Sequence, residues 1–341
     1  MLHAQHKAPS SERSASMIIQ SVSRIAIPVL AALGLAQSPA SQAQSVYPER
    51  PIRIVVPFVP GGVSDVIARQ IGQKITEQTG KAIVVENRGG AGGRIGYEHG
   101  AKASPDGYTM VATDATYTML PGIYGKLNWE HTDLTSVLLV AQMPFVITVK
   151  SGGPYGTLEQ LVKGARETPG RITFGSSGNG AVNHLVTELF MRGAGITLQH
   201  VPYKGMGDAV LGLLSGQVEL LVAALPTGLP HVKSGKMTAL AVSSANRANA
   251  APQIPTAREQ GIDFVTNNWV GFTLPKGSPP EAYTWMRKAT LAALAMPELR
   301  ERIASMGAEM TILEGAPFDK MIRDETARWS GVIKAAGIRA D

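Results

Sequence analysis

Short apolar segments that predict strands alternate with helical segments along the first part of the chain. Strands are predicted at 52–58 (IRIVVPF), 82–88 (AIVVENR) and 108–115 (YTMVATDA). After the first of them, apolar residues from Val66 to Ile75 recur at the spacing of one helix face. This β-α-β-α-β order is typical of a parallel sheet covered by helices, so it restricts the fold to the α/β class.

The same alternation restarts after residue 150 and predicts a second α/β half. Its strands are predicted at 172–177, 198–204, 219–225 and 237–244. After residue 278 the sequence is nearly all helical in pattern. The last helix has one apolar face, made of Ile322, Trp329, Val332, Ile333 and Ala336.

Two extended apolar segments, 144–150 and 269–275, are placed to carry the chain from the first half to the second and back. We therefore predict two α/β lobes joined by a two-strand hinge, with a ligand cleft between them. In this prediction lobe 1 comprises 44–148 plus 269–341, and lobe 2 comprises 149–268.

Residues 1–43 have the pattern of a secretory signal peptide. The apolar run at 25–36 is much shorter than the roughly 20 residues that a membrane span needs. Arg24 precedes the run, and Ser41-Gln42-Ala43 follows it as a small-x-small cleavage pattern. We predict cleavage after Ala43 and a periplasmic location, with Met17 as an alternative start of translation.

The predicted mature chain is mildly basic and has no cysteine. Residues 1–43 contain three basic residues and one acidic residue, so their removal lowers the formal charge from +6 to +4. The basic residues are scattered, unlike those of a nucleic-acid-binding face, and a mild positive charge suits an anionic ligand. The absence of cysteine excludes disulfides, thiolate metal ligands and cysteine nucleophiles.

Glycine-rich loops follow predicted strands in both halves, at the edge where open α/β sheets bind ligands. In the first half this edge carries Phe58, Pro60, Gly61, Gly62, Ser64, Thr113 and Asp114. In the second half it carries Ser176, Ser177, Gly178, Asn179, Gly180, Tyr203 and Ala224. Two of the loops run directly into helices, where exposed backbone N–H groups and the helix dipole attract anions. We therefore predict a binding site for a negatively charged ligand; a tight turn with positive φ is the alternative explanation of Gly61-Gly62.

Signatures of enzymes and metal sites are incomplete. The segment FGSSGNG lacks the Gly-x-Ser-x-Gly spacing, and GGAGGRIG does not fit the dinucleotide-binding pattern. His184 and Glu188 stand four residues apart without a third ligand at metal spacing, which favours a pair on one helix face or a cap contact. His200 and His231 are isolated in the sequence and are predicted to be structural or exposed.

With these motifs in order, the mature chain resembles the periplasmic receptors of tripartite tricarboxylate transporters, also called Bug receptors. The matching stretches are YPERPIRIVVPFVPGGVSDVIAR, VVENRGGAGGRIG, AKASPDGYTM, FGSSGNGAVNHL, HVPYKGMGDAV, and PTAREQG followed by WVGFTLPKGSPPE. The resemblance implies a type II periplasmic-binding-protein fold that closes on small carboxylates, without catalytic activity, metal or cofactor. It also implies that the loops Phe58–Ser64 and Ser176–Gly180 hold a ligand carboxylate, partly through ordered water.

The sequence departs from the family pattern at Gly89-Gly90, Ala181, Ala223-Ala224 and Asp114. Ala223 and Ala224 replace polar residues, which favours an apolar or aromatic ligand body. Asp114 is expected to repel a second ligand carboxylate and to accept an amine or hydroxyl donor. Capping of the following turn is the alternative role of Asp114.

The predicted function is capture of a small carboxylate, such as an organic acid, an aromatic acid or an amino acid, by a monomer that delivers it to membrane permease subunits. Two alternatives stay open from the sequence: a ligand-sensing receptor of a two-component system, and a secreted hydrolase that uses Ser176 or Ser177. The hydrolase needs a histidine beside the serine. His184 suits this poorly because it lies two turns along a helix.

Overall fold

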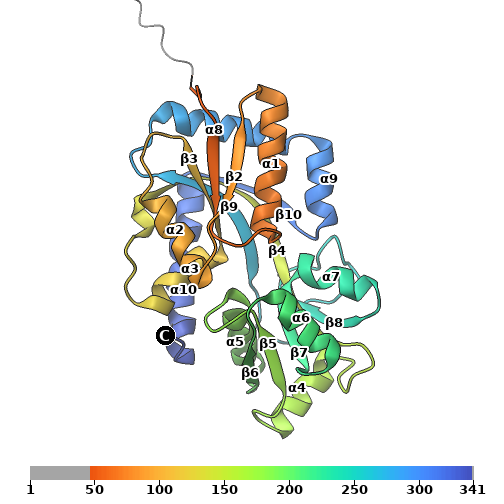
Figure 1. Cartoon of the computed structure of the whole chain (residues 1–341). Helices are drawn as coiled ribbons and strands as arrows, with labels where there is room; N and C mark the ends of the chain where they lie inside the picture. Colours follow the sequence, from red (N-terminus) through yellow and green to blue (C-terminus); the bar gives the residue numbers. More distant parts are fainter. Residues whose placement is uncertain (1–46, 340–341) are drawn as a thin grey trace, which may run out of the picture. The chain divides into compact units, whose positions relative to one another are not determined.

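The computed structural model describes residues 47–339 (Figure 1). The predicted signal peptide and its cleavage site lie outside the described residues. Within 47–339, no helix combines the length and the apolar character that crossing a bilayer requires.

Three parallel strands, with β1 in the middle, form the sheet of the first lobe. They are β1 (Ile52–Val56), β2 (Ile83–Asn87) and β3 (Thr109–Asp114). The helices of this part are α1 (Val63–Thr79), α2 (Arg94–Ala101) and α3 (Ala115–Tyr124), with a short 3-10 turn η1 (Ala91–Gly93). All three predicted strands are confirmed to within two residues at each end, whereas α3 has no counterpart in the sequence prediction.

The second lobe repeats this arrangement. Its strands are β5 (Thr173–Ser176), β6 (Gln199–Pro202), β7 (Leu220–Ala224) and β8 (Met237–Val242). Its helices are α4 (Leu158–Glu167), α5 (Val182–Ala194), α6 (Met206–Ser215) and α7 (Leu225–Lys233), and η3 (Arg258–Gln260) follows β8. The strand β5 lies between β6 and β7 and is parallel to both.

Two long strands connect the lobes: β4 (Leu134–Lys150), which follows the turn η2 (His131–Asp133), and β9 (Asn267–Pro275). The first part of β4, as far as Pro144, pairs with β9, and its remainder from Phe145 pairs with β7 and β8. Ser243 ties the two connections together, because its Oγ accepts from the Phe145 N–H at 2.8 Å and donates to the Thr266 carbonyl at 2.6 Å.

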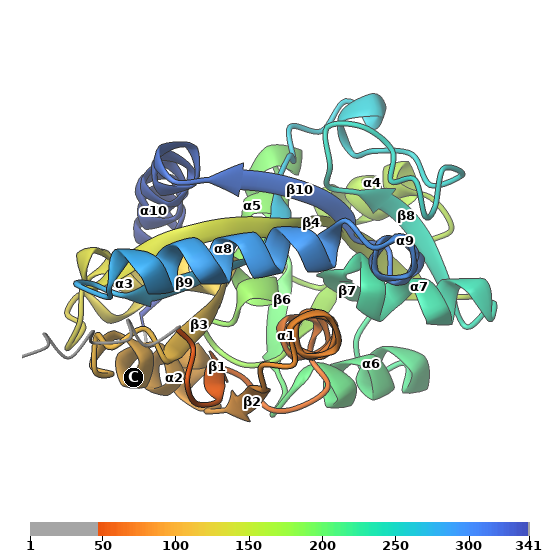
Figure 2. The same ribbon diagram turned by 90° about the horizontal axis from the view of Figure 1, so that it is seen from above.

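The C-terminal segment contains α8 (Pro280–Leu294), α9 (Pro297–Ser305), β10 (Glu309–Glu314) and α10 (Ala316–Ala336). The prediction of a tail that is nearly all helical is wrong at β10, which pairs antiparallel with β4 (Figure 2). The apolar face predicted for the last helix is confirmed for Ile322, Trp329, Val332 and Ile333, which are buried with Phe318. Ala336 is only partly buried.

The helix α10 contacts both lobes. It packs against α3, where Gly122 leaves room for the Ile333 side chain. Arg328 of the same helix donates from Nη2 to the Val265 carbonyl at 2.6 Å, just before β9. Trp329 and Ile333 belong to the same buried cluster as Leu185 of α5. The C-terminal helix therefore fixes the first lobe and the connection between the lobes at once.

Candidate functional site

The loop between β1 and α1 is organised by the buried side chain of Asp65. Its carboxylate accepts from the Gly61 N–H at 2.9 Å, from Asn87 Nδ2 at 2.9 Å and from Arg69 Nε at 3.0 Å. Burial raises the pKa of Asp65, but the hydrogen bonds from Arg69, Gly61 and Asn87 outweigh burial and hold the pKa below its usual value. The Gly61 N–H is therefore engaged inside the loop, and the prediction that it is free for a ligand is wrong.

The first turn of α1 still offers backbone donors. Gly62 is the N-cap, in extended conformation and without a side-chain cap. Within the described part of the chain, the N–H groups of Gly62, Val63 and Ser64 have no acceptor. Gly61 has φ +91° and open space around its Cα, so the turn explanation is confirmed for this residue. Gly61 bends the chain, and the donors that remain free belong to the residues after it.

The loop between β5 and α5 uses most of its donors on itself. The Ser176 hydroxyl donates to the Gly178 carbonyl at 2.9 Å, and the Gly178 N–H points back to the same hydroxyl at 3.2 Å. Ser177 donates to Asn183 Oδ1 from both its N–H (3.3 Å) and its hydroxyl (2.8 Å). The Gly180 N–H donates to His184 Nδ1 at 3.1 Å. The prediction that the loop exposes the N–H groups of Gly178 and Gly180 is therefore wrong.

The start of α5 resembles the start of α1. Ala181 is its N-cap and provides no side-chain cap. Among the residues that the structure covers, the N–H groups from Val182 to His184 have no acceptor, and neither does that of the exposed Asn179. The Nδ2 of the buried Asn183 also lacks a partner. Free donors thus gather at the N-termini of two long helices that follow β1 and β5.

His200 of β6 lies beside this second loop. Its Nε2 is 2.6 Å from Ser176 Oγ, and its ring stacks on His184 with the ring centres 3.7 Å apart and the planes 16° apart. Burial, and to a smaller extent the neighbouring His184, lower the pKa of His200 to about 4. The prediction that His200 is structural or exposed is confirmed in its first form: the pairing of β5 with β6 brings Phe174 and His200 opposite each other, and His200 contacts the loop.

The contact between Ser176 and His200 bears on the hydrolase alternative, since it supplies a histidine beside the serine. Ser176 is fully buried, however, and its hydroxyl is already bonded to the Gly178 carbonyl. No carboxylate of residues 47–339 hydrogen-bonds the other ring nitrogen of His200, as the orienting acid of a catalytic triad does. The geometry is that of a hydrogen bond that fixes a loop.

Asp114 is the N-cap of α3. Its carboxylate accepts from the Thr116 N–H and from the Tyr97 hydroxyl, each at 2.9 Å. Burial raises the pKa of Asp114 to about 6, although these hydrogen bonds act in the opposite direction. This arrangement is the capping role that the sequence left open. Thr113, the preceding residue, is fully buried, and its hydroxyl has no partner in the described chain.

The remaining predicted site residues differ in their exposure and in the groups that they contact. The Phe58 ring packs edge-on against Tyr97, and Pro60 is exposed. Tyr203 donates its N–H to the Ser176 carbonyl at 2.9 Å, while its hydroxyl turns to Gln217 beyond α6. Ala224 is the N-cap of α7, and Ala223 is buried in β7. Tyr203 therefore supports the loop through its backbone and not through its ring.

A groove of about 620 Å³ joins the start of α1 to the second lobe. It is lined by Gly61, Gly62, Val63, Val66, Pro226, Thr227, Leu229, Pro230, Lys233, Arg302, Ser305 and Met306. Its two cations, Lys233 and Arg302, are exposed and come from different lobes. The groove contains predicted site residues from the β1–α1 loop, whereas those of the β5–α5 loop do not line it.

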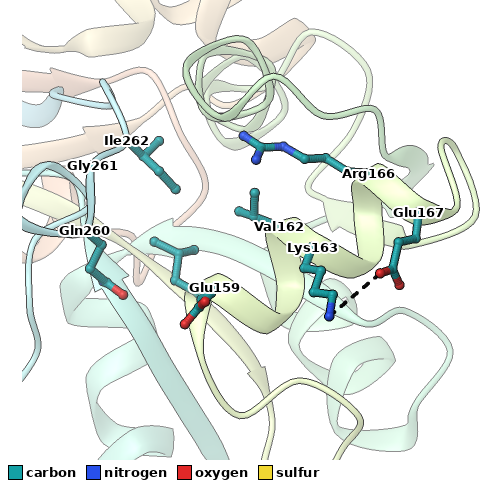
Figure 3. Close-up of a pocket in the computed structure, with 9 residues that line it drawn as sticks. Glu159, Val162, Lys163, Arg166, Glu167, Gln260, Gly261 and Ile262 are labelled. Carbon is teal, nitrogen blue, oxygen red and sulfur yellow. Dashed lines mark ion pairs between the residues drawn. The ribbon is translucent and has the colours of Figure 1, made fainter.

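A second cavity, of about 830 Å³, lies within the second lobe, between α4 and the segment 260–262 (Figure 3). Glu159, Lys163, Arg166 and Glu167 project from α4 toward it, and Gln260 and Ile262 form the opposite side. None of the predicted site residues lines this cavity, so it does not belong to the candidate site.

Sequence reasoning missed three residues of the site: Asp65 as the organiser of the first loop, and Asn183 and His200 as supports of the second. The cap contact or helix-face pair predicted for His184 is confirmed by its contacts with Gly180 and Glu188. Asn183 and His184 stand in the first turn of α5, directly after the glycine-rich loop, and this position was a usable signal. The role of His200 depends on the pairing of β5 with β6 and on a contact with Ser176, 24 residues away in the sequence, and left no local signal.

Comparison with known proteins agrees with this architecture. The family model described as tripartite tricarboxylate transporter family receptor matches residues 67–338. The protein BugT of Bordetella pertussis is 34% identical over 297 residues, which are 86% of this chain and 91% of BugT.

Two solved structures are similar over the whole of their chains. The periplasmic binding protein BugD is 32% identical with a TM-score of 0.78, and the match covers 86% of this chain and all of BugD. A protein of R. palustris, solved with adipate, is also 32% identical, with a TM-score of 0.79 and the same coverage. The fold is therefore the two-lobed α/β fold of periplasmic binding proteins, and the chain belongs to the Bug family of tripartite tricarboxylate transporter receptors.

Proposed function

We propose that this receptor captures a small organic acid by its carboxylate at the starts of α1 and α5 and delivers it to the membrane components of a tripartite tricarboxylate transporter. The observation that carries the proposal is the pair of uncapped N-termini, on helices of 17 and 13 residues, with unpaired N–H groups. A helix N-terminus attracts an anion through its free donors and its dipole. In this proposal the receptor acts by binding alone, without a chemical step.

The chemistry of the surroundings supports an anionic ligand. Two carboxylates near the strand ends of the first lobe, Asp65 in α1 and Asp114 at the start of α3, are buried and bonded to protein donors. Lys233 and Arg302 line the groove beside Gly62, where they suit a second anionic group. The R. palustris relative was solved with adipate, a dicarboxylate. We therefore rank linear dicarboxylates first and aromatic acids and amino acids second.

The cellular setting is part of the same proposal. A monomer exported by the predicted signal peptide would bind its ligand in the periplasm and close by rotation of 44–148 plus 269–341 against 149–268. A receptor that signals to a two-component system uses the same binding step, so binding measurements do not separate it from a transport receptor. Deletion of the neighbouring permease genes separates them: uptake of the ligand stops only if the receptor serves transport.

The test removes single N–H donors with proline. Val63 and Val182 are the first residues of α1 and α5, a position that proline tolerates because its missing N–H has no helical partner there. The preceding residues, Gly62 and Ala181, are already in the extended conformation that proline requires. Val63→Pro and Val182→Pro should each weaken binding about tenfold or more, since each removes a hydrogen bond to a charged group.

The matched controls are Val63→Ala and Val182→Ala, which truncate the same side chains and keep the N–H groups. Affinity is measured by calorimetry with the best ligand from a thermal-shift panel of mono- and dicarboxylates, aromatic acids and amino acids. Equal affinities of the proline and alanine variants would show that the helix starts do not bind the carboxylate. Hydrolysis of an ester or amide in the same panel would favour the hydrolase instead.

A further inference from the structure

The loop Ser176–Gly180 is held at both ends by a histidine. At its end, the Gly180 N–H donates to His184 Nδ1 at 3.1 Å. At its beginning, Ser176 Oγ lies 2.6 Å from His200 Nε2. The two histidines stack on each other, and Phe174 of β5 stacks on His200 with ring centres 4.9 Å apart. The loop therefore rests on a buried pair of imidazole rings that come from α5 and β6.

The bond to Gly180 fixes the protonation of His184. A ring nitrogen accepts a hydrogen bond only when it carries no proton, so Nδ1 must be the bare nitrogen and Nε2 carries the hydrogen. Nε2 faces Glu188 at 3.7 Å, one turn further along α5. Protonation of Nδ1 would place two N–H groups head to head and break the contact with Gly180.

The stacked arrangement also opposes a charge on both rings at once. The rings are parallel and 3.7 Å apart, so two imidazolium ions would repel each other at short range. Two kinds of titratable group face the pair. Glu188 of α5 faces His184, and each of the two histidines faces the other. The strand β5 contributes only the neutral side chains of Phe174 and Ser176. Glu188 is the one partner among these that favours a charged His184.

We propose that His184 and His200 are positioning residues for ligand binding, and that His184 holds the Ser176–Gly180 loop in its binding conformation only while its Nδ1 carries no proton. This inference rests on the proposed function, because the ligand is taken to bind where this loop enters α5. The Ser176 hydroxyl donates to Gly178, so His200 Nε2 is the donor to Ser176 and fixes the start of the loop. Acid should therefore release the loop and weaken binding.

The experiment compares wild type with a double variant that cannot titrate. In His184→Asn the side-chain oxygen can take the place of Nδ1 as acceptor for Gly180, and in His200→Gln the amide can reach Ser176 as Nε2 does. Dissociation constants for adipate, or for the best acid of the panel, are measured from pH 4 to pH 8. The ratio of the two constants at each pH cancels the ionisation of the ligand and of Asp114, which both proteins share. His231→Gln, on α7, is the control for loss of a histidine outside the loop.

We expect the wild type to lose up to about tenfold more affinity than the double variant as the pH falls, which corresponds to the loss of one hydrogen bond between neutral groups. A ratio that stays constant over this range would overturn the proposal. The single variants His184→Ala and His200→Ala should each weaken binding at pH 8, and the amide replacements should restore it.

A second readout needs no ligand. In the free protein, the amide resonance of Gly180 should shift together with the ring nitrogens of His184 in NMR titrations, and it should be independent of pH in the double variant. A Gly180 amide that ignores the titration of both rings would contradict the proposal even if acid weakens binding. If no acid of the panel binds, the proposed function fails, and the Gly180 amide alone decides whether the histidines hold the loop.

Discussion

Two buried aspartates near the ends of neighbouring strands differ in how their environment sets their charge. Asp65 receives three donors, one of them the cation Arg69, and its pKa is lowered. Asp114 receives the Tyr97 hydroxyl and backbone donors but no cation, and burial raises its pKa to about 6. The number and charge of the donors, rather than depth alone, determine whether the pKa of a buried carboxyl is raised or lowered.

Replacement of Asp114 should make the protein more stable at neutral pH. The unfolded chain ionises this carboxyl near pH 3.8 and the folded chain near pH 6, so ionisation costs folding free energy as the pH rises between these values. Asp114→Asn keeps an acceptor for Thr116 and Tyr97 and avoids this cost. The free energy of unfolding of the variant, relative to wild type, should rise between pH 4 and pH 6.5 by about 3 kcal/mol at most. Urea titrations at several pH values measure it, and a difference that does not change with pH would contradict the assignment.

Replacement of Asp65 should have the opposite effect. Asp65→Ala leaves the Gly61 N–H and Asn87 Nδ2 without their acceptor, at a cost of about 2–3 kcal/mol of unfolding free energy. Because its folded pKa is lowered, the loss should be full at neutral pH and should shrink as the pH falls below about 3.8. Arg69→Ala is the control, since the Arg69 side chain is 49% exposed and its loss should cost less than about 1 kcal/mol. Equal losses for the two variants would show that Asp65 acts only through the ion pair.

At the scale of elements, the packing of α10 against α3 depends on one missing side chain. A Cβ on Gly122 would lie 2.7 Å from Ile333 Cδ1 and 3.3 Å from the Ser330 backbone. Gly122→Val should therefore destabilise the protein by about 1–3 kcal/mol. Gly331 lies in α10, and a Cβ added there would meet no other atom within 4 Å. Gly331→Ala should therefore stabilise α10 by up to about 1 kcal/mol. Thermal unfolding of both variants tests the contact, and two changes of equal sign would contradict it.

The elements that the sequence predicted are those whose pattern is local. The strand β7 is a continuous apolar run and β1 is apolar except for Arg53, and their positions followed from this pattern. The missed helices α3 and α7 contain Pro121 with Gly122, and Pro230 with Gly228, which are turn signals in a sequence. In the fold these glycines permit close packing. Gly122 of α3 packs against Ile333 of α10, and Gly228 of α7 packs against Val146 of β4. Tertiary contacts therefore decide the helical state of these two segments.

The candidate site shows the same limit. The sequence located both glycine loops, because a glycine-rich turn between strand and helix is a local signal. It could not show which N–H groups the loops use internally, since Asp65, Asn183 and His184 return to the loops from within the helices. Nor could it place β10, a short strand of partly exposed residues that is defined by its partner β4.

At the scale of the whole molecule, the two connections between the lobes meet at Ser243, whose hydroxyl bonds to both of them. The strands β4 and β9 are also paired with each other along most of β9. Such a paired two-strand connection allows rotation of the lobes while it keeps their register.

Ligand should therefore compact the molecule. We expect a smaller radius of gyration by small-angle scattering when the best acid of the panel saturates the receptor, because closure expels solvent from between the lobes. Trp269 of β9 packs edge-on against Phe318, so its fluorescence should change in the same titration. Trp269→Phe is the control that assigns the signal. A radius of gyration that stays the same at saturation would speak against a hinged receptor.

The strand order also has a consequence for the order in which a growing chain can fold. The strand β3 pairs with β1 on one side and with β9 on the other, and α3 packs against α10. The elements β9 and α10 come late in the chain, so the first lobe lacks these packing partners until nearly the last residue has been made. The strands β5, β6 and β7 and their connecting helices are contiguous in the chain, and their mutual pairing is available much earlier. The lobe whose synthesis begins first is thus the lobe whose contacts are completed last.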